Sequence, residues 1–343
     1  MNRLLIVNLC LILICAGQTV RSADSIRVTM PDMREWLKFD GAIKTKLEIS
    51  TDSGSIRFNV RNSRMGLRGD IGEYLSYRVQ VELSSEGSFA PLDLFGTLKP
   101  AKGLSISLGQ TSVPFENSYI ITPAEMMFSN RAFVGKFFTP GSRDIGAVIH
   151  YRFVSGKLPF ELQAGTFNGG RINNPQWTDR PSYALRMSVG KMEGFRTSAK
   201  IYRYAGETLD LLLWGADLHY AGKRLRLEAE AMNRNPEGGG GETLFGAYIQ
   251  GAYVFDLNRS KIFHNLWPAL RWDAMGYGTD RNGFDVNRLT FGLNFGLSLK
   301  PFASVLRVDY EQYFVRGGHF PEFDNRDLHV SDNKLTIELL IKF

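Results

Sequence analysis

The sequence has only two cysteines, Cys10 and Cys15, among its 343 residues. Both lie in the first 22 residues, which we interpret below as a cleaved leader, so the mature chain would contain no thiol. Disulfide bonds and thiolate-bound metals are therefore excluded from the mature chain. A small extracellular module held together by disulfides is excluded for the same reason.

Long apolar runs are also missing after the leader. The richest stretch, residues 209–214, is interrupted by Asp210, whereas a helix needs about 18 mostly apolar residues to cross a bilayer. Membrane-spanning helices are therefore excluded. A closed β-barrel is the other structure that can span a membrane, because neighbouring strands satisfy all backbone hydrogen bonds.

Excess charge of one sign is small as well. The chain carries a formal net charge of +6, which falls to +4 once Arg3 and Arg21 of the expected leader are removed. Such a small excess does not favour a nucleic-acid partner. The sequence has only five histidines, and no nucleophile motif accompanies any of them. We therefore expect no enzyme activity, catalytic residue, cofactor or metal site, although an outer-membrane barrel enzyme is kept as an alternative.

The amino terminus has the features of a secretory signal peptide. Arg3 supplies the positive charge and residues 4–16 form an apolar core. Cleavage after Ser22 would leave Val20 and Ser22 at the positions that need small residues, whereas cleavage after Ala23 would place Arg21 at one of them. A lipoprotein modification at Cys15 is disfavoured because Ile14 precedes it. We expect a signal peptide at residues 1–22, a periplasmic lead-in at residues 23–35 and a barrel over residues 36–343.

The dominant pattern in the remaining chain is a two-residue alternation of apolar and polar side chains. It is clearest at residues 289–299, where leucine and phenylalanine alternate with threonine, glycine, asparagine and serine. Along residues 56–68 the alternation slips by one position near Asn62, which predicts a β-bulge. A secreted β-sandwich would not carry such an apolar stripe on the exposed face of every strand. Such stripes are typical of a transmembrane barrel.

The alternation divides the chain into sixteen expected strands. Sixteen is an even number, as a closed bacterial barrel requires, and it leaves a water-filled channel inside. Residues 209–220 are apolar on both faces, so their orientation stays open. The expected strands are 37–49, 56–68, 77–83, 92–98, 104–108, 145–153, 160–168, 183–189, 195–201, 209–220, 225–231, 243–255, 266–276, 289–299, 303–315 and 335–343.

One long segment, residues 112–142, lacks the alternation. Unstructured connections longer than about 15 residues are uncommon and usually functional. With both termini in the periplasm, this segment is the third extracellular loop. We predict that it folds inward and narrows the channel.

Four stretches then resemble the phosphate-selective porin O and P family: FNVRNSRMGLRGDIG at residues 58–72, YRVQVELSSEG downstream, LKPAKGLSISLGQTSVPF, and SNRAFV followed by RDIGA. The resemblance is strongest over residues 37–153. It implies a trimeric, sixteen-stranded diffusion channel constricted by its third loop.

Basic residues are the candidates for selectivity. The alternation turns Arg57, Arg61 and Arg64 toward the bore, and three more lie in or beside the long segment, namely Arg131, Lys136 and Arg143. Guanidinium groups suit anions because their planar fork can bond two oxygens at once. An alternative is that the arginines pair with Glu116 and Glu125 of the segment and pin it to the wall. Inward charges elsewhere are of both signs, so selectivity must come from the constriction.

These observations predict an outer-membrane porin of a Gram-negative bacterium. It would be a passive diffusion channel for small hydrophilic solutes that prefers anions such as phosphate. A non-selective porin whose loop filters only by size is the alternative. The expected partners are the lipid bilayer, small anionic solutes, two further copies in a homotrimer, and the barrel-assembly machinery, which would read the last strand ending at Phe343.

Overall fold

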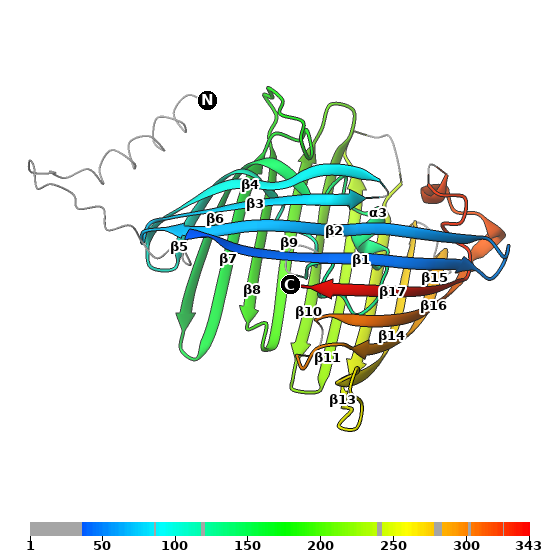
Figure 1. Ribbon diagram of the computed structural model, residues 1–343. Coiled ribbons are helices and arrows are strands. Elements are labelled where there is room, and N and C mark those ends of the chain that lie inside the picture. The colour runs from blue at the N-terminus through cyan, green and yellow to red at the C-terminus, as the bar shows by residue number, and fades with distance from the viewer. Residues whose placement is uncertain are drawn as a thin grey trace, which may run out of the picture. The chain divides into compact units, whose positions relative to one another are not determined.

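The computed structural model describes residues 36–343 except 86, 118–120, 239–241, 278–282, 301–302 and 325. The expected leader at 1–22 and the lead-in at 23–35 lie outside the described residues. The described part contains one antiparallel sheet and a few short helices (Figure 1). None of the described helices is long and apolar enough to cross a membrane.

The strands are β1 (Lys38–Ser50), β2 (Ile56–Ile71), β3 (Leu75–Ser85), β4 (Ser88–Ala101), β5 (Leu104–Ser112), β6 (Arg143–Ser155), β7 (Leu158–Phe167), β8 (Ser182–Gly190), β9 (Gly194–Ala205), β10 (Asp210–Ala221), β11 (Leu225–Pro236), β12 (Leu244–Tyr253), β13 (Phe255–Asp256), β14 (Asn265–Tyr277), β15 (Val286–Gly296), β16 (Val305–Val315) and β17 (Lys334–Lys342). The helices are α3 (Val134–Phe137) and the single 3₁₀ turns η2 (Arg316–Gly318) and η3 (Pro321–Phe323).

Each strand pairs with its neighbour in the chain, and β1 closes the sheet by pairing with β17, which lies beside it in Figure 1. The 2-residue β13 only extends the line of β12, because both pair with β14. The other 16 strands of the described chain form the closed wall of the barrel, which confirms the predicted architecture. Ala42 pairs with Lys342, so the start of β1 and the end of β17 lie at the same end of the barrel. This end is called here the inner end. The opposite end, with the long loops, is the outer end.

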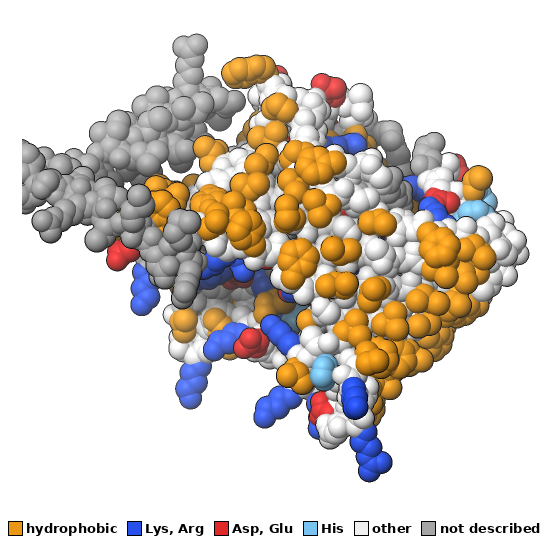
Figure 2. Space-filling view, viewed as in Figure 1, with side chains coloured by type: hydrophobic (Ala, Val, Ile, Leu, Met, Phe, Trp, Pro, Cys, Tyr) orange, Lys and Arg blue, Asp and Glu red, His pale blue; other side chains and the backbone are white. Residues whose placement is uncertain are grey.

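The side chains of the wall are arranged with apolar groups outside and polar groups inside. On β15, Phe291 and Leu293 are 53% and 48% exposed, whereas Thr290 and Asn294 are fully buried inside. Figure 2 shows the resulting apolar cover on the outer surface. A water-soluble protein has the opposite arrangement, whereas a barrel in a bilayer has this one.

The predicted bulge is present in β2. Asn62 has a positive φ of 57°, and the register with β3 shifts between Arg61 and Ser63. Asparagine tolerates this left-handed conformation better than most side chains do. The extra residue restores the inward direction for Arg64 after Arg61, so both line the interior.

The orientation of β10 is decided by what lies inside the barrel. Leu211 and Leu213 point inward and are 3% and 0% exposed, while Trp214 points outward and is 50% exposed. The two leucines belong to a core cluster with Phe133 and Phe137 of the long segment after β5. An apolar inner face is therefore stable here because another part of the chain covers it.

Candidate functional site

The segment between β5 and β6, residues 113–142, is called here loop 3, and its described residues, 113–117 and 121–142, are bound to the inner face of the wall. Its backbone is held by charged wall side chains. Arg288 Nη2 donates to the carbonyl oxygen of Arg131 at 2.8 Å, and Asp273 Oδ2 accepts from the amide of Phe133 at 2.9 Å. Further wall contacts to loop backbone come from Arg186, Arg234, Arg271, Arg307 and Asp309. A loop without strand partners needs such bonds, because buried backbone groups must be paired.

The apolar side chains of loop 3 face the same part of the wall. Phe115, Phe133 and Phe138 are each 1% exposed and belong to the core cluster that includes wall residues of β8–β12, β14 and β15. Phe115 and Tyr202 of β9 have ring centroids 5.8 Å apart. Loop 3 is therefore fixed by packing as well as by hydrogen bonds.

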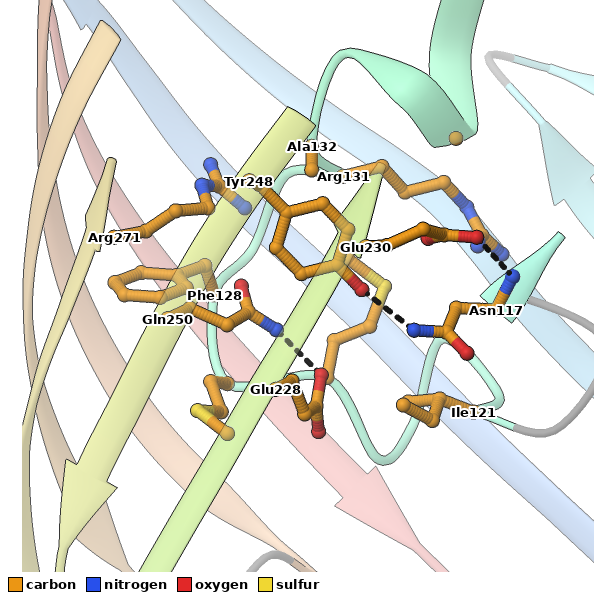
Figure 3. A pocket seen from close by; sticks show the side chains of 13 residues that line it. Asn117, Ile121, Phe128, Arg131, Ala132, Glu228, Glu230, Tyr248, Gln250 and Arg271 are labelled. Carbon is orange, nitrogen blue, oxygen red and sulfur yellow. Dashed lines mark hydrogen bonds between the residues drawn. The ribbon is translucent and has the colours of Figure 1, made fainter. Parts of the chain in front are cut away.

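Behind loop 3 lies a small cavity of about 50 Å³, shown in Figure 3. Asn117 donates from its amide to Glu230 Oε1 at 3.1 Å and from Nδ2 to Tyr248 Oη at 2.8 Å. Gln250 Nε2 donates to Glu228 Oε2 at 2.6 Å. Acidic wall groups thus lie on the side of loop 3 that is turned away from the central lumen.

The central lumen lies on the other side of loop 3, as a cavity of about 470 Å³. It is bordered by loop 3 residues 129–131 and 135–136 and by strands β1, β2 and β15–β17. Its charged lining consists of Lys44, Lys46, Glu48, Arg57, Arg61, Arg64, Arg131, Lys136, Arg288, Glu311, Arg326, Asp327, Lys334 and Glu338. Ten of these side chains are basic and four are acidic, a formal excess of six positive charges.

All four acidic groups of this lining pair with basic groups. Glu48 pairs with Lys46 and Arg57 at 2.8 Å each, and Asp327 pairs with Arg57 at 2.5 Å. The other two carboxylates pair with buried wall cations, as Glu311 does with Arg288 at 2.8 Å and Glu338 does with Lys44 at 3.1 Å. Hence the local negative charge of the lining is already neutralised by part of its positive charge.

Five of the six predicted selectivity residues line this cavity. Arg57, Arg61 and Arg64 come from β2, while Arg131 and Lys136 come from loop 3 on the facing side. Arg64 Nε also donates to Glu82 Oε2 at 2.8 Å, which neutralises part of its charge.

Arg143, the sixth predicted residue, is not part of the cavity lining. Its Nε donates to Asp93 Oδ1 at 2.6 Å, and its Nη2 donates to Gln80 Oε1 at 3.4 Å. It ties the start of β6 to β3 and β4. Arg143 was predicted to contribute to anion selectivity in the constriction, but its side chain does not line the central cavity.

The two predicted acidic partners in loop 3 lie outside the lining of the central cavity. Glu125 Oε1 lies 3.0 Å from Lys342 Nζ at the inner end of β17, so Glu125 pairs with this lysine and not with the arginines named in the alternative interpretation. Glu116 is 5% exposed and accepts a hydrogen bond from the hydroxyl of Thr139 within the loop. Because loop 3 is held on its wall side, neither carboxylate lines the central cavity.

Sequence reasoning did not single out several cations of the lining. Lys44 and Lys46 alternate with apolar residues along β1, and this alternation could have identified them as inward-facing. Arg288 occupies an inward position on β15 and could have been found in the same way. Arg326 lies in an irregular loop, where no periodicity indicates direction.

No metal-binding arrangement accompanies these charges. Within the part of the chain that the structure describes, no group of three or more His, Cys, Asp or Glu side chains could hold a metal ion. The lumen lining offers cationic and hydrogen-bonding side chains to a solute.

The barrel is similar to solved outer-membrane proteins. Salmonella typhi OmpF, in a complex with daunomycin, is 15% identical with a TM-score of 0.63, over 90% of this chain and 97% of that one. The anion-selective porin from Comamonas acidovorans is 12% identical with a TM-score of 0.58, over 90% and 99% of the two chains. In-vitro folded OmpT of Vibrio cholerae, in its trimer form, is 11% identical with a TM-score of 0.58, over 90% and 99%.

At these identities the similarity establishes the fold, a closed antiparallel barrel of the porin type. No protein-family model matches the chain, and no curated protein matches it. The resemblance of residues 58–72 to the phosphate-selective porins therefore stays a prediction.

Proposed function

We propose that this protein is a porin of the Gram-negative outer membrane, a passive diffusion channel for small hydrophilic solutes that prefers anions. Three properties support the proposal: the apolar outer surface, the charged interior with its water-accessible cavity, and the porin-type fold. An outward apolar band suits lipid, whereas an interior rich in charged side chains suits water and ions.

The observation that carries the anion preference is the formal excess of six basic side chains in the lining of the central cavity, two of which, Arg64 and Arg288, also pair with Glu82 and Asp273 outside the lining. Among the described residues, no carboxylate forms an ion pair with Arg131, Lys136, Arg326 or Lys334. At physiological ionic strength charges are screened over about 8 Å, so groups that line one narrow cavity act together on a passing ion. The lumen should therefore hold a positive potential that attracts anions and repels cations.

Phosphate is one candidate among small anions. A guanidinium can donate two parallel hydrogen bonds to phosphate oxygens, and Arg61 and Arg131 border the cavity from facing sides. Beside Arg61, however, stands the neutral Asn62 at the bulge. We therefore propose selectivity for anions as a class, with phosphate as a member that competition experiments can test.

Two partners belong to the same proposal. We propose a homotrimer, as for the Vibrio cholerae protein solved in a trimer form. We also propose that barrel-assembly machinery binds the carboxyl-terminal strand. Phe343 is 60% exposed, and its backbone exchanges two hydrogen bonds of 2.9 and 3.0 Å with Gly41, where the barrel closes.

The test is the zero-current potential of purified protein in a planar bilayer under a salt gradient. The parent should be anion-selective, and the double substitution Arg131→Glu/Lys136→Glu, which changes the formal local charge by four units, should move the potential toward cation selectivity. A matched control is Lys223→Glu/Arg224→Glu, which makes the same change in the exposed turn between β10 and β11. Added phosphate should reduce the chloride current of the parent more than that of the Arg131→Glu/Lys136→Glu variant.

The alternative is a non-selective porin whose loop filters by size. It would be favoured if both double variants had the same zero-current potential as the parent. In that case the excess positive charge of the lining would have no functional effect, and the anion preference would be abandoned.

A further inference from the structure

The last outer loop, residues 316–333 between β16 and β17 and called here the last loop, packs on loop 3. Its Phe320 and Val330 are 2% and 6% exposed and belong to the same core cluster as Phe137 of α3. The rings of Phe323 and Phe137 have centroids 5.5 Å apart. The last loop therefore leans into the barrel, against the short helix of loop 3, and is fixed there by aromatic packing.

Ion pairs hold the last loop at two distant parts of the wall. Arg234 of β11 pairs with Glu322 and also donates to the carbonyl oxygen of Phe137 at 2.9 Å, so one guanidinium binds both loops. Arg57 of β2 pairs with Asp327 at 2.5 Å. In the strand order β2 and β11 are nearly half a barrel apart. The last loop thus crosses the outer mouth of the lumen.

The crossing segment borders two cavities. Arg326 and Asp327 line the central cavity together with Arg61 and Lys136. Arg326 also lines an outer cavity of about 410 Å³, and its guanidinium carbon lies 5.2 Å from the ring centroid of Phe137. Since Arg326 borders both cavities, it lies where one passes into the other, together with Arg131 and Lys136 of loop 3, which also border both. A solute moving inward would pass this side chain before it reaches Arg64, which lies further from the outer end of β2.

We propose that the last loop is a second selectivity element, in series with loop 3. Arg326 limits the width of the passage between the outer and central cavities and adds a cation at that point, and Asp327 narrows the central cavity beside it. The role in size selection is independent of ion preference. The role of Arg326 as a cation rests on the proposed function.

The size role is tested with Arg326→Ala/Asp327→Ala, which shortens both side chains without changing the formal net charge. Uptake of neutral sugars into proteoliposomes should become about two-fold faster for a trisaccharide and change little for a monosaccharide, because only the larger solute is limited by width. The matched control, Arg316→Ala/Asp324→Ala, removes the same pair of charges from the same loop at positions outside both cavity linings. It should behave like the parent.

A second measurement uses Asp327→Cys. Both natural cysteines, Cys10 and Cys15, lie in the expected leader, so the introduced thiol would be the single target in the mature chain. A bulky thiol reagent should lower the single-channel conductance more than a small one, while Asp324→Cys should show no such difference. The proposal fails if Asp327→Cys behaves like Asp324→Cys, or if the two double-alanine variants transport sugars equally.

Neutral sugars separate this proposal from the proposed anion preference. If the zero-current potential shows no anion preference but Arg326→Ala/Asp327→Ala still admits the trisaccharide faster, the last loop is a size filter in a non-selective channel. If anion preference is found and the sugars are unaffected, loop 3 alone narrows the channel.

Discussion

Arg288 Nη2 on β15 donates to the carbonyl oxygen of Arg131 at 2.8 Å, so a wall cation holds loop 3 at a residue that borders the lumen. The same guanidinium pairs with Asp273 at 2.7 Å and with Glu311 at 2.8 Å. It also lies over the ring of Phe133, with its carbon 4.5 Å from the centroid. One buried side chain thus links the wall to both the backbone and the aromatic packing of loop 3.

Arg288→Met should loosen loop 3. The substitution leaves Asp273 and Glu311 with fewer partners in a buried setting, and removing one member of a buried ion network costs about 3–5 kcal/mol. We expect the single-channel conductance of this variant to be larger and noisier than that of the parent. In semi-native electrophoresis, its compact band should disappear at a lower temperature.

The control for Arg288 is Arg224→Met. Arg224 pairs with Asp256 at 3.1 Å, but both side chains are more than half exposed, and exposed pairs contribute only about 0–1 kcal/mol. Its variant should behave like the parent. Equal behaviour of the Arg288 and Arg224 variants would show that Arg288 does not hold loop 3.

Deletion of residues 119–134 should impair assembly in addition to widening the channel. Asp309 accepts from both the amide and the hydroxyl of Ser129 at 2.7 Å, and Asp273 accepts from the amide of Phe133. Without the loop these buried carboxylates lose bonds, and Leu211 and Leu213 lose their apolar cover. Unsatisfied buried polar groups cost about 1–3 kcal/mol each.

The measurement is the fraction of protein that reaches the compact, heat-modifiable form after refolding in detergent. Deletion of residues 175–179, an exposed part of the loop between β7 and β8, is the control and should leave that fraction unchanged. If both deletions fold equally well, loop 3 is a removable constriction without a role in barrel stability.

The anion preference should weaken at alkaline pH because of Lys136. Loss of solvation inside the barrel, followed by repulsion from Arg288 and Lys334, lowers the pKa of Lys136 from 10.5 to about 7. Part of the side chain is open to the lumen, and water there offsets some of the desolvation. Raising the pH through this range removes one positive charge from the lining, so the zero-current potential should move toward cation selectivity.

Lys136→Gln should have a weaker anion preference than the parent at low pH and a flatter dependence on pH. Lys157→Gln, in the turn between β6 and β7, should keep the parental pH dependence. A parental profile in the Lys136 variant would assign the titration to another group.

Much of the wall was predictable because strand alternation is a local property. The alternation at residues 289–299 predicts which side chains face lipid without reference to any other strand. The structure confirms these directions over residues 289–296, whereas residues 297–299 lie beyond the end of β15. The slip near Asn62 was equally local, since a single extra residue reverses the direction of every later side chain in the strand. The same parity brought Arg57, Arg61 and Arg64 to the lumen.

The ion-pair partner of a charged side chain was harder to predict than the direction in which the side chain points. Glu125 was considered as a partner of the candidate arginines, but it lies beside Lys342 at the inner end. Arg143 was expected in the constriction, yet Asp93 of β4 binds it. In an irregular segment such as loop 3 no period relates one residue's direction to the next, so sequence spacing does not say which charges meet.

The sequence alone determined a closed barrel of sixteen strands, because alternation, turns and an even strand count depend on neighbouring residues. The tertiary structure decided how the interior is filled. The inward direction of Leu211 and Leu213, the acidic groups behind loop 3 and the contact of the last loop with Arg57 all depend on residues far apart in the chain. These contacts form only once the barrel encloses them, because burial and charge pairing in the lumen are set by the closed wall.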